Sequence, residues 1–299
     1  MRYPRLNLGR RSSQAAISVV AVAAAAFAGI SASEARASPR AASSAPAESA
    51  LVHRLATCLA PGQAKPTVVL VHGAWADASS WSGEVAALQA AGYDVRAIAN
   101  PLQNLTTDSQ YVADYLKAVH GPVVLVGHSY GGSVITNAAA GTANVKSLVY
   151  VDAAAPAPGQ TTAQLSGADS VMITMRPAEL FNITTAPTGT AELYLKESIF
   201  IHHFASDLPP NKAHVLWASQ RGTSTAALTT PSTAAAWKTI PSWYFISTGD
   251  QIITPASELA MARHAHSHIT IFQGGSHLTL ISHPNAVTAV IAAAICSLR

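Results

Sequence analysis

The chain has 299 residues, of which 49% are hydrophobic and 11% are charged. This composition excludes a disordered or collagen-like chain, and the length is sufficient to bury a substantial core. The formal net charge of +3 comes from the N-terminus, because residues 1–37 hold five Arg and one Glu. The rest of the chain carries 13 basic and 14 acidic residues. We therefore expect no basic surface that binds nucleic acid.

The first 37 residues have the pattern of a secretory signal peptide. A basic stretch ends at Arg10-Arg11, an apolar run covers about 15–30, and Ala35-Arg36-Ala37 offers a cleavage site. The apolar run is short for a membrane span, and no Cys follows it at the spacing of a lipoprotein. We expect cleavage after Ala37, export by the general secretory or the twin-arginine route, and a secreted or periplasmic protein without a stable membrane anchor.

Residues 38–64 are rich in Ala, Ser and Pro and show no periodicity, which predicts a flexible lead-in. This stretch contains Cys58, and the only other cysteine of the sequence is Cys296. The two ends of a compact domain often lie close together, and an exported chain meets an oxidising compartment. We therefore predict a disulfide between Cys58 and Cys296, with two inert thiols as the alternative.

Strands and helices alternate from Pro66 onward. Short apolar runs such as Val123–Val126 are typical of strands that are buried on both faces of a parallel sheet. The alternation predicts an α/β fold with a doubly wound, mostly parallel sheet. The expected strands are 67–71, 93–99, 123–126, 145–151, 243–247 and 269–272, and the expected helices are 79–91, 106–119 (with Thr106 as N-cap), 130–140, 255–264 and 284–297.

The alternation stops between about 156 and 241. This stretch has helical spacing at 191–204 and 211–220 and no strong strand pattern. Because sheet elements flank it, we predict a helical cap inserted in a domain that spans 65–299. The cap is expected over the C-terminal edge of the sheet, where open α/β sheets bind their ligands.

A G-x-S-x-G motif, Gly127-His128-Ser129-Tyr130-Gly131, follows the expected strand at 123–126 and opens a helix. This strand–turn–helix context is that of a nucleophile elbow. The turn is too tight to admit side chains beside the serine, so glycines flank it. The motif therefore predicts that Ser129 presents its hydroxyl as a nucleophile at the start of a helix.

From about Lys65 to the C-terminus, apart from much of the cap, these motifs resemble the α/β-hydrolase superfamily. The segment His72-Gly73-Ala74-Trp75 is similar to the branch of methyl-salicylate-type esterases, hydroxynitrile lyases and small bacterial esterases. The resemblance implies a serine hydrolase whose nucleophile, acid and histidine follow one another in that order along the chain.

The histidine and the acid are selected by their positions after strands. His277 lies in the loop after the last expected strand, where the superfamily carries its catalytic histidine, and His283 is the rival. Asp250 follows the expected strand at 243–247 and precedes His277 by 27 residues. Some relatives carry the acid one strand earlier, which makes Asp152 the alternative. The expected roles are general base for His277 and orientation of the imidazole for Asp250.

Two backbone N–H groups are expected to stabilise the oxyanion of the reaction. One belongs to Tyr130, the residue after the nucleophile, and the resemblance places the other on Ala74. His72 and His128 match positions that are structural in the superfamily. Trp75, beside the oxyanion loop, is a candidate for the substrate pocket.

Phe204 and Trp217, in the expected cap, are further pocket candidates, and packing within the cap is their alternative role. Three histidines alternate at His264, His266 and His268, a spacing that would gather metal ligands on one face of an extended segment. They span the junction of an expected helix and an expected strand, so we interpret them as a solvated connector. We expect no metal and no cofactor.

We therefore expect an exported serine esterase that cleaves small to medium carboxylic esters through an acyl-enzyme. A lactone or thioester hydrolase with the same residues is the alternative, followed by a receptor of hydrolase fold that binds ligand without turnover. Hydroxynitrile lyase chemistry ranks below hydrolysis, because Gly73 stands where those lyases carry Thr and Leu278 where they carry Lys. The sequence leaves the particular substrate, the cap geometry and the oligomeric state open.

Overall fold

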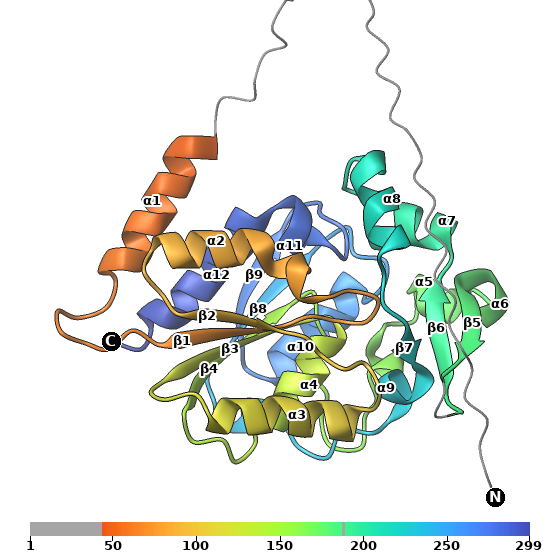
Figure 1. The fold of residues 1–299 in the computed structure, drawn as a ribbon, viewed down its shortest axis with the longest axis horizontal. Coiled ribbons are helices and arrows are strands. Elements are labelled where there is room, and N and C mark those ends of the chain that lie inside the picture. Colours follow the sequence, from red (N-terminus) through yellow and green to blue (C-terminus); the bar gives the residue numbers. More distant parts are fainter. Residues whose placement is uncertain (1–43, 187–188) are drawn as a thin grey trace, which may run out of the picture. The chain divides into compact units, whose positions relative to one another are not determined.

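The computed structural model describes residues 44–186 and 189–299 (Figure 1). The predicted signal peptide at 1–37 lies outside the described residues. Within the described ranges, no helix has both the length and the apolar character needed to cross a membrane.

A six-stranded parallel sheet forms the centre of the fold, in the order β2-β1-β3-β4-β8-β9. This confirms the predicted doubly wound parallel sheet. The chain leaves β1 toward β2 and then returns to place β3 on the other side of β1, so a topological switch point lies between β1 and β3. The strands are β1 (Thr67–Val71), β2 (Val95–Ile98), β3 (Val123–His128), β4 (Val145–Val151), β8 (Ser242–Ser247) and β9 (His268–Phe272).

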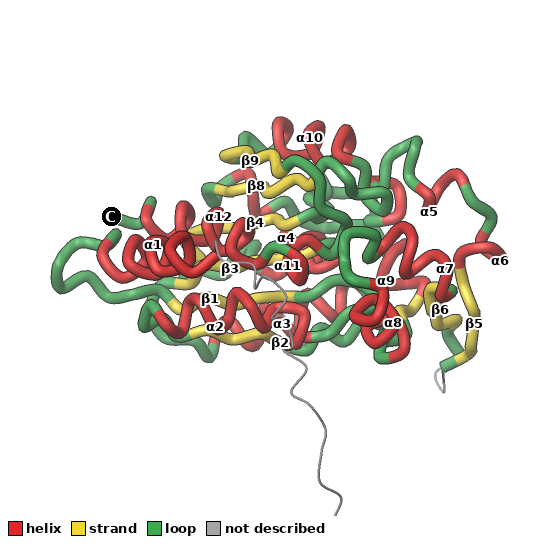
Figure 2. Tube along the Cα trace, turned by 90° about the horizontal axis from the view of Figure 1, so that it is seen from above, coloured by secondary structure: helices red, strands yellow, loops and turns green. Residues whose placement is uncertain are grey.

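Helices cover both faces of this sheet, which is why every residue of β1, β3 and β8 is buried (Figures 1 and 2). The prediction that Thr106 is the N-cap of the helix at 106–119 is wrong. Asn104 is the N-cap, because its side-chain Oδ1 accepts a hydrogen bond from Thr106 N at 2.9 Å. The helices around the sheet are α2 (Ser82–Ala90, preceded by a 3₁₀ turn at Ala78–Trp81), α3 (Leu105–Lys117), α4 (Tyr130–Ala138), α10 (Pro255–His264), α11 (Thr279–Ser282) and α12 (Pro284–Cys296).

The expected flexible lead-in at 38–64 contains a helix, α1 (Ser44–Thr57), so the expectation is wrong for these residues. Leu55 is fully buried, and its carbonyl accepts from Tyr93 Oη at 2.7 Å. Leu51 packs one turn earlier against the same core. The Ala-rich sequence obscured this short apolar face, which is stabilised by tertiary packing.

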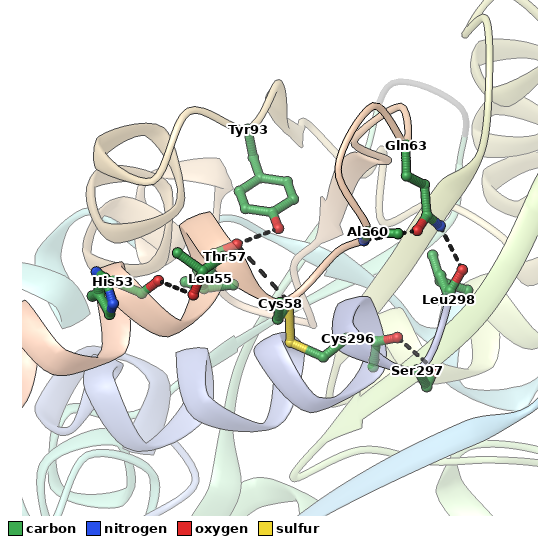
Figure 3. The surroundings of a disulfide bond; sticks show 11 residues. His53, Leu55, Thr57, Cys58, Ala60, Gln63, Tyr93, Cys296, Ser297 and Leu298 are labelled. Atoms are coloured by element: carbon green, nitrogen blue, oxygen red, sulfur yellow. Dashed lines mark hydrogen bonds between the residues drawn. A yellow bond between two sulfur atoms is a disulfide. The ribbon is translucent and has the colours of Figure 1, made fainter.

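Cys58, just past the end of α1, forms a disulfide with Cys296 at the end of α12, with 5.3 Å between their Cα atoms (Figure 3). The structure thus joins the two cysteines that the sequence paired. Nearby, Gln63 Nε2 donates to the carbonyl of Leu298 at 2.5 Å. The segment after α1 and the C-terminal end of the chain at α12 are therefore joined by a covalent bond and a hydrogen bond.

The cap lies between β4 and β8, beyond the C-terminal ends of the strands (Figures 1 and 2). The sequence predicted a helical cap, and the structure corrects this prediction. The cap also holds a three-stranded antiparallel sheet in the order β5-β6-β7. The helix expected at 191–204 is a strand over Ala191–Leu195, where Leu193 and Leu195 are buried at a period of two.

The cap elements are α5 (Val171–Thr174), α6 (Pro177–Leu180), β5 (Phe181–Thr185), β6 (Ala191–Leu195), α7 (Glu197–Ile199), a π-helical turn (Phe200–Phe204), α8 (Pro210–Ala218), β7 (Thr223–Ser224) and α9 (Thr225–Thr229), with 3₁₀ turns at Ala163–Leu165 and Ala236–Lys238.

Candidate active site

Ser129 occupies a sharp turn between β3 and α4. Its φ of 55° lies in the left-handed region, which is strained for a residue with a side chain. The turn closes because Gly127 lacks a side chain: a Cβ there would lie 2.5 Å from the carbonyl oxygen of Gly131. The sequence therefore folds locally into an elbow that places the Ser129 side chain at the start of α4.

The loops after β8 and β9 bring two further side chains to this serine. His277 Nε2 lies 2.8 Å from Ser129 Oγ, and His277 Nδ1 lies 2.6 Å from Asp250 Oδ2. All three side chains are buried. His283 and Asp152, the alternatives from the sequence, are not bonded to this group: His283 Nδ1 contacts Ser282 Oγ at 2.9 Å, and Asp152 contacts Ser247.

Burial controls the protonation of this group. Desolvation lowers the pKa of His277 to about 3, so its imidazole is neutral at pH 7 and can accept a proton. Burial also raises the pKa of Asp250 well above the ordinary carboxyl range. The backbone N–H groups of Ile252 and Ile253 oppose this shift by donating to Asp250 Oδ1 at 2.7 and 3.2 Å. These N–H donors stabilise the anionic form of Asp250.

Two other histidines of the site have structural contacts, as the sequence predicted. His128 Nε2 lies 2.8 Å from the carbonyl oxygen of His277, and the two rings pack at 4.8 Å between centroids. His72 Nε2 accepts from the backbone N–H of Asn100 at 3.0 Å. Burial lowers the pKa of His72 to about 4 and that of His128 well below its usual value, so both are neutral.

The two expected oxyanion donors come from the neighbouring strands at the switch point. Tyr130 is the first residue of α4, so its N–H has no acceptor within the helix. Ala74 follows β1 and lines the cavity beside Ser129. The next residue, Trp75, is tied to the cap: its backbone N–H donates to Thr223 Oγ1 at 3.0 Å and its Nε1 to the Leu193 carbonyl at 2.9 Å.

A cavity of about 300 Å³ opens onto Ser129. Its lining holds no charged side chain and is mostly apolar, with the loops of the sheet on one side and the cap on the other. The lining residues are Ala74, Trp75, Ser129, Ile252 and Ile253 from the sheet side and Thr162, Ala163, Ser166, Met172, Ile173, Pro177, Phe181, Leu193, Thr225, Leu228 and Thr229 from the cap.

The three pocket candidates from the sequence have different positions. Trp75 lines the cavity, as expected. Phe204 is not among the lining residues and packs against His277, with 5.1 Å between ring centroids, and against Trp75, with 6.0 Å. Trp217 is not brought to this cavity, because its Nε1 donates to the Leu195 carbonyl at 3.2 Å and its ring lines a separate surface hollow. Trp217 is therefore a cap-packing residue, and the expectation for it is wrong.

A cluster of buried acids adjoins the site. Asp152, Asp250 and Glu258 each place one carboxylate oxygen within 4.8 Å of the others. Oxygen ligands of this kind bind hard cations, but an ion here would compete with the hydrogen bond from His277 to Asp250. The three alternating histidines, interpreted from the sequence as a connector, do not share one face, because His264 ends α10, His266 lies in the turn after it and His268 begins β9.

Several contacts of the site were missed by sequence reasoning. Asp207, in the cap, accepts hydrogen bonds from Ser276 Oγ and from Ser282 Oγ, and thereby ties the cap to the histidine loop. Glu258, on α10, is fully buried although helix positions of Glu are usually exposed. Neither residue belongs to a local motif, so no sequence signal pointed to them.

Comparisons with known proteins agree with this fold. Residues 68–290 match the model of the alpha/beta hydrolase family. The carbendazim hydrolyzing esterase of Nocardioides sp. is 38% identical over 108 residues, a match that covers 31% of this chain and only 44% of that esterase. The chain therefore aligns with less than half the length of this curated relative.

Solved structures share the fold. Polyneuridine aldehyde esterase has a TM-score of 0.65 at 15% identity, over 79% of this chain and 99% of that one. An extracellular alpha/beta-hydrolase from a Paenibacillus species, described as homologous to tobacco salicylic acid binding protein 2, has a TM-score of 0.64 at 22% identity, over 77% and 98%. The family match over residues 68–290 places the chain in the alpha/beta hydrolase family, and these solved structures share its fold.

Proposed function

We propose that the mature protein is an exported, metal-independent serine hydrolase that cleaves carboxylic esters of small to medium size through an acyl-enzyme. The observation that carries the proposal is the continuous contact from Asp250 through His277 to Ser129, at 2.6 and 2.8 Å, with Ser129 in the wall of an apolar cavity. A neutral histidine between a buried carboxylate and a strained serine is the arrangement that activates a hydroxyl.

In the first half of the reaction, Ser129 Oγ attacks the ester carbonyl and His277 Nε2 takes its proton. Asp250 holds the imidazole in the tautomer that has the proton on Nδ1, and it stabilises the imidazolium that forms. The backbone N–H groups of Ala74 and Tyr130 stabilise the oxyanion, and each such donor contributes on the order of 10²–10³ in rate.

The tetrahedral intermediate then collapses as His277 gives its proton to the leaving alcohol. Water enters and attacks the acyl-enzyme, with His277 again as base, and the second collapse returns the proton to Ser129 Oγ. The products are the alcohol and the carboxylic acid. No step calls for a metal, so we expect EDTA to leave the rate unchanged.

The cavity supports uncharged, mainly apolar esters. With no charged side chain in its lining, a carboxylate or ammonium group on the substrate would lose hydration without gaining a partner. The matched relative from Nocardioides is named as an esterase that hydrolyses carbendazim. Lactones and thioesters pass through the same tetrahedral chemistry and belong in the same screen.

The test is steady-state hydrolysis of p-nitrophenyl acetate and butyrate by the purified mature protein. We expect sustained release of p-nitrophenol, loss of release in Ser129→Ala, and no change in Ser297→Ala, an exposed serine at the C-terminal end of α12 that serves as the matched control. One equivalent of p-nitrophenol without further turnover would instead indicate a ligand-binding receptor. Inactivation by EDTA with recovery on adding zinc would contradict the serine mechanism.

Export is part of the proposal and has its own measurement. N-terminal sequencing of the protein collected outside the cytoplasm should begin at Ser38, the residue after Ala37. A mature protein that starts at Met1 would contradict it.

A further inference from the structure

A line of polar groups runs from Asp152, at the end of β4, to the loop that carries His277. Asp152 Oδ2 lies 2.9 Å from Ser247 Oγ, Ser247 Oγ lies 2.7 Å from Thr279 Oγ1, and Thr279 Oγ1 donates to the carbonyl of Ser276 at 2.6 Å. All four residues are buried. Ser276 is the residue immediately before His277, so this line ends at the backbone that holds the imidazole.

The number of protons along this line decides the state of Asp152. The line has three hydrogen bonds, but the two hydroxyl groups supply only two protons. The Ser276 carbonyl accepts only, so it takes the proton of Thr279, and Thr279 Oγ1 in turn takes the proton of Ser247. The remaining bond, between Ser247 Oγ and Asp152 Oδ2, then needs a proton that belongs to Asp152 itself.

The other oxygen of Asp152 is consistent with this assignment. Oδ1 accepts from the backbone N–H of Ser247 at 2.7 Å, so it acts as the carbonyl oxygen of a carboxylic acid while Oδ2 acts as the hydroxyl. A neutral Asp152 therefore uses both oxygens, one as acceptor and one as donor.

The charge around Asp152 favours the same state. Asp152 is fully buried, and oxygen atoms of Asp250 and Glu258 lie within 4.8 Å of it and of each other. Burial and the neighbouring Asp250 raise the pKa of Asp152 well above its usual range. Both oxygens of Glu258 lack a hydrogen-bond partner, and burial raises its pKa too, which favours its neutral form.

We infer that Asp152 is a neutral carboxylic acid that positions the His277 loop by donating a proton into the line through Ser247 and Thr279 to the Ser276 carbonyl. The inference rests on the proposed function, in which His277 is the base. It makes Asp152 a positioning residue that touches neither the substrate nor the reacting atoms.

The assignment predicts an effect on the rate of the chemical step and not on substrate binding. Asp152, Ser247 and Thr279 do not line the cavity beside Ser129. Loss of the line should therefore lower kcat, because the imidazole is less well placed, and leave KM unchanged.

An amide distinguishes a neutral Asp152 from an anionic one. In Asp152→Asn the side-chain oxygen can accept from Ser247 N and the NH₂ group can donate to Ser247 Oγ, which reproduces the neutral acid. We expect kcat within about twofold of wild type for Asp152→Asn. For Asp152→Leu, and for Thr279→Val, we expect kcat about tenfold lower, the factor that corresponds to one hydrogen bond of about 1.4 kcal/mol. A loss in Asp152→Asn as large as that in Asp152→Leu would overturn the inference.

A spectroscopic measurement tests the proton without using activity. The infrared difference spectrum of wild type minus Asp152→Asn, recorded at pH 7 with ¹³C-labelled aspartate, should show a carboxylic acid C=O band that shifts with the label. A carboxylate band in its place would overturn the inference. This test uses only wild type and Asp152→Asn, so it remains valid if Asp152→Leu fails to fold. If Ser129→Ala kept full activity, the proposed function would fail while the infrared result still reported the state of Asp152.

Discussion

The loops at the edge of the sheet and the cap form opposite walls of one cavity, and they are built from different contacts. On the sheet side, Ser129, His277 and Asp250 are joined by hydrogen bonds of 2.6 and 2.8 Å and are buried in place. On the cap side, the cavity is lined mainly by apolar side chains such as Met172 and Phe181.

This difference indicates that the two walls of the cavity have different roles in the proposed reaction. Directional hydrogen bonds fix reacting atoms within the narrow limits that proton transfer requires. Apolar side chains supply shape and exclude water, and they can be exchanged without losing a directional bond. We therefore expect substitutions on the sheet side to act on kcat, and substitutions on the cap side to change which ester is preferred.

After removal of the nucleophile itself, the largest effect should come from Asp250→Asn. The amide would favour the wrong tautomer of His277, and the drop in kcat in the best-studied triad is about 10⁴. The measurement is kcat for p-nitrophenyl butyrate, with Asp152→Asn as the matched control at the end of the neighbouring strand. If Asp152→Asn abolished activity and Asp250→Asn kept it, the acid would have been assigned to the wrong strand.

The pH dependence of kcat/KM is the next test of the sheet side. An exposed histidine has a pKa of about 6.5, whereas burial lowers the pKa of His277 to about 3. Because the base must be neutral, activity should persist as the pH falls through 6.5 and decline only at lower pH. If kcat/KM fell to half its maximum near pH 6.5, the His277 imidazole would be solvated and the cavity wall would be open to water.

The sequence was informative for the sheet side because each proposed catalytic residue follows a strand with a readable pattern. Ser129 lies in a local motif, and Asp250 and His277 follow the apolar strands at 243–247 and 269–272. The cap sequence has no strands with a comparably clear apolar pattern. Its strand Ala191–Leu195 was mistaken for a helix because Ala, Glu and Leu favour helices in isolation, whereas pairing with β5 and β7 decides the structure.

Contacts that join distant segments were also beyond sequence reasoning. Trp217 was expected in the pocket from its apolar character, but its indole packs within the cap. Asp207 and Glu258 acquire their environments only when α10, the cap and the histidine loop come together. Such contacts depend on tertiary packing and leave no periodic signal in the chain.

On the cap side, Phe181→Ala should change selectivity by about tenfold. The ring lines the cavity and stacks on Trp75 at 5.8 Å between centroids, so its removal enlarges the space for the substrate. We expect kcat/KM for p-nitrophenyl octanoate to rise relative to the acetate. Val215→Ala, at an exposed position of α8, is the matched cap control and should leave the ratio unchanged. If the octanoate-to-acetate ratio of kcat/KM were the same in Phe181→Ala as in Val215→Ala, the substrate would bind away from Phe181.

The smallest effect on activity is expected from opening the disulfide. The disulfide Cys58–Cys296 joins the end of α1 to α12, and neither cysteine lines the cavity. A variant with Cys58→Ser and Cys296→Ser should lose about 3–5 kcal/mol of unfolding free energy in the chain-entropy account and keep its kcat at 25 °C. Denaturant unfolding and kcat measured on the same preparation separate the two effects. A loss of kcat in the folded variant would show that the two helices also support the catalytic loops.

The central claim is that Ser129 is the nucleophile, and covalent labelling tests it most directly. A fluorophosphonate reagent incubated with the mature protein, followed by peptide mass analysis, should add one label to the peptide that contains Ser129. Ser129→Ala should take up none, and Asp250→Asn should react far more slowly than wild type. A label on a different residue, or undiminished labelling of Ser129→Ala, would contradict the account.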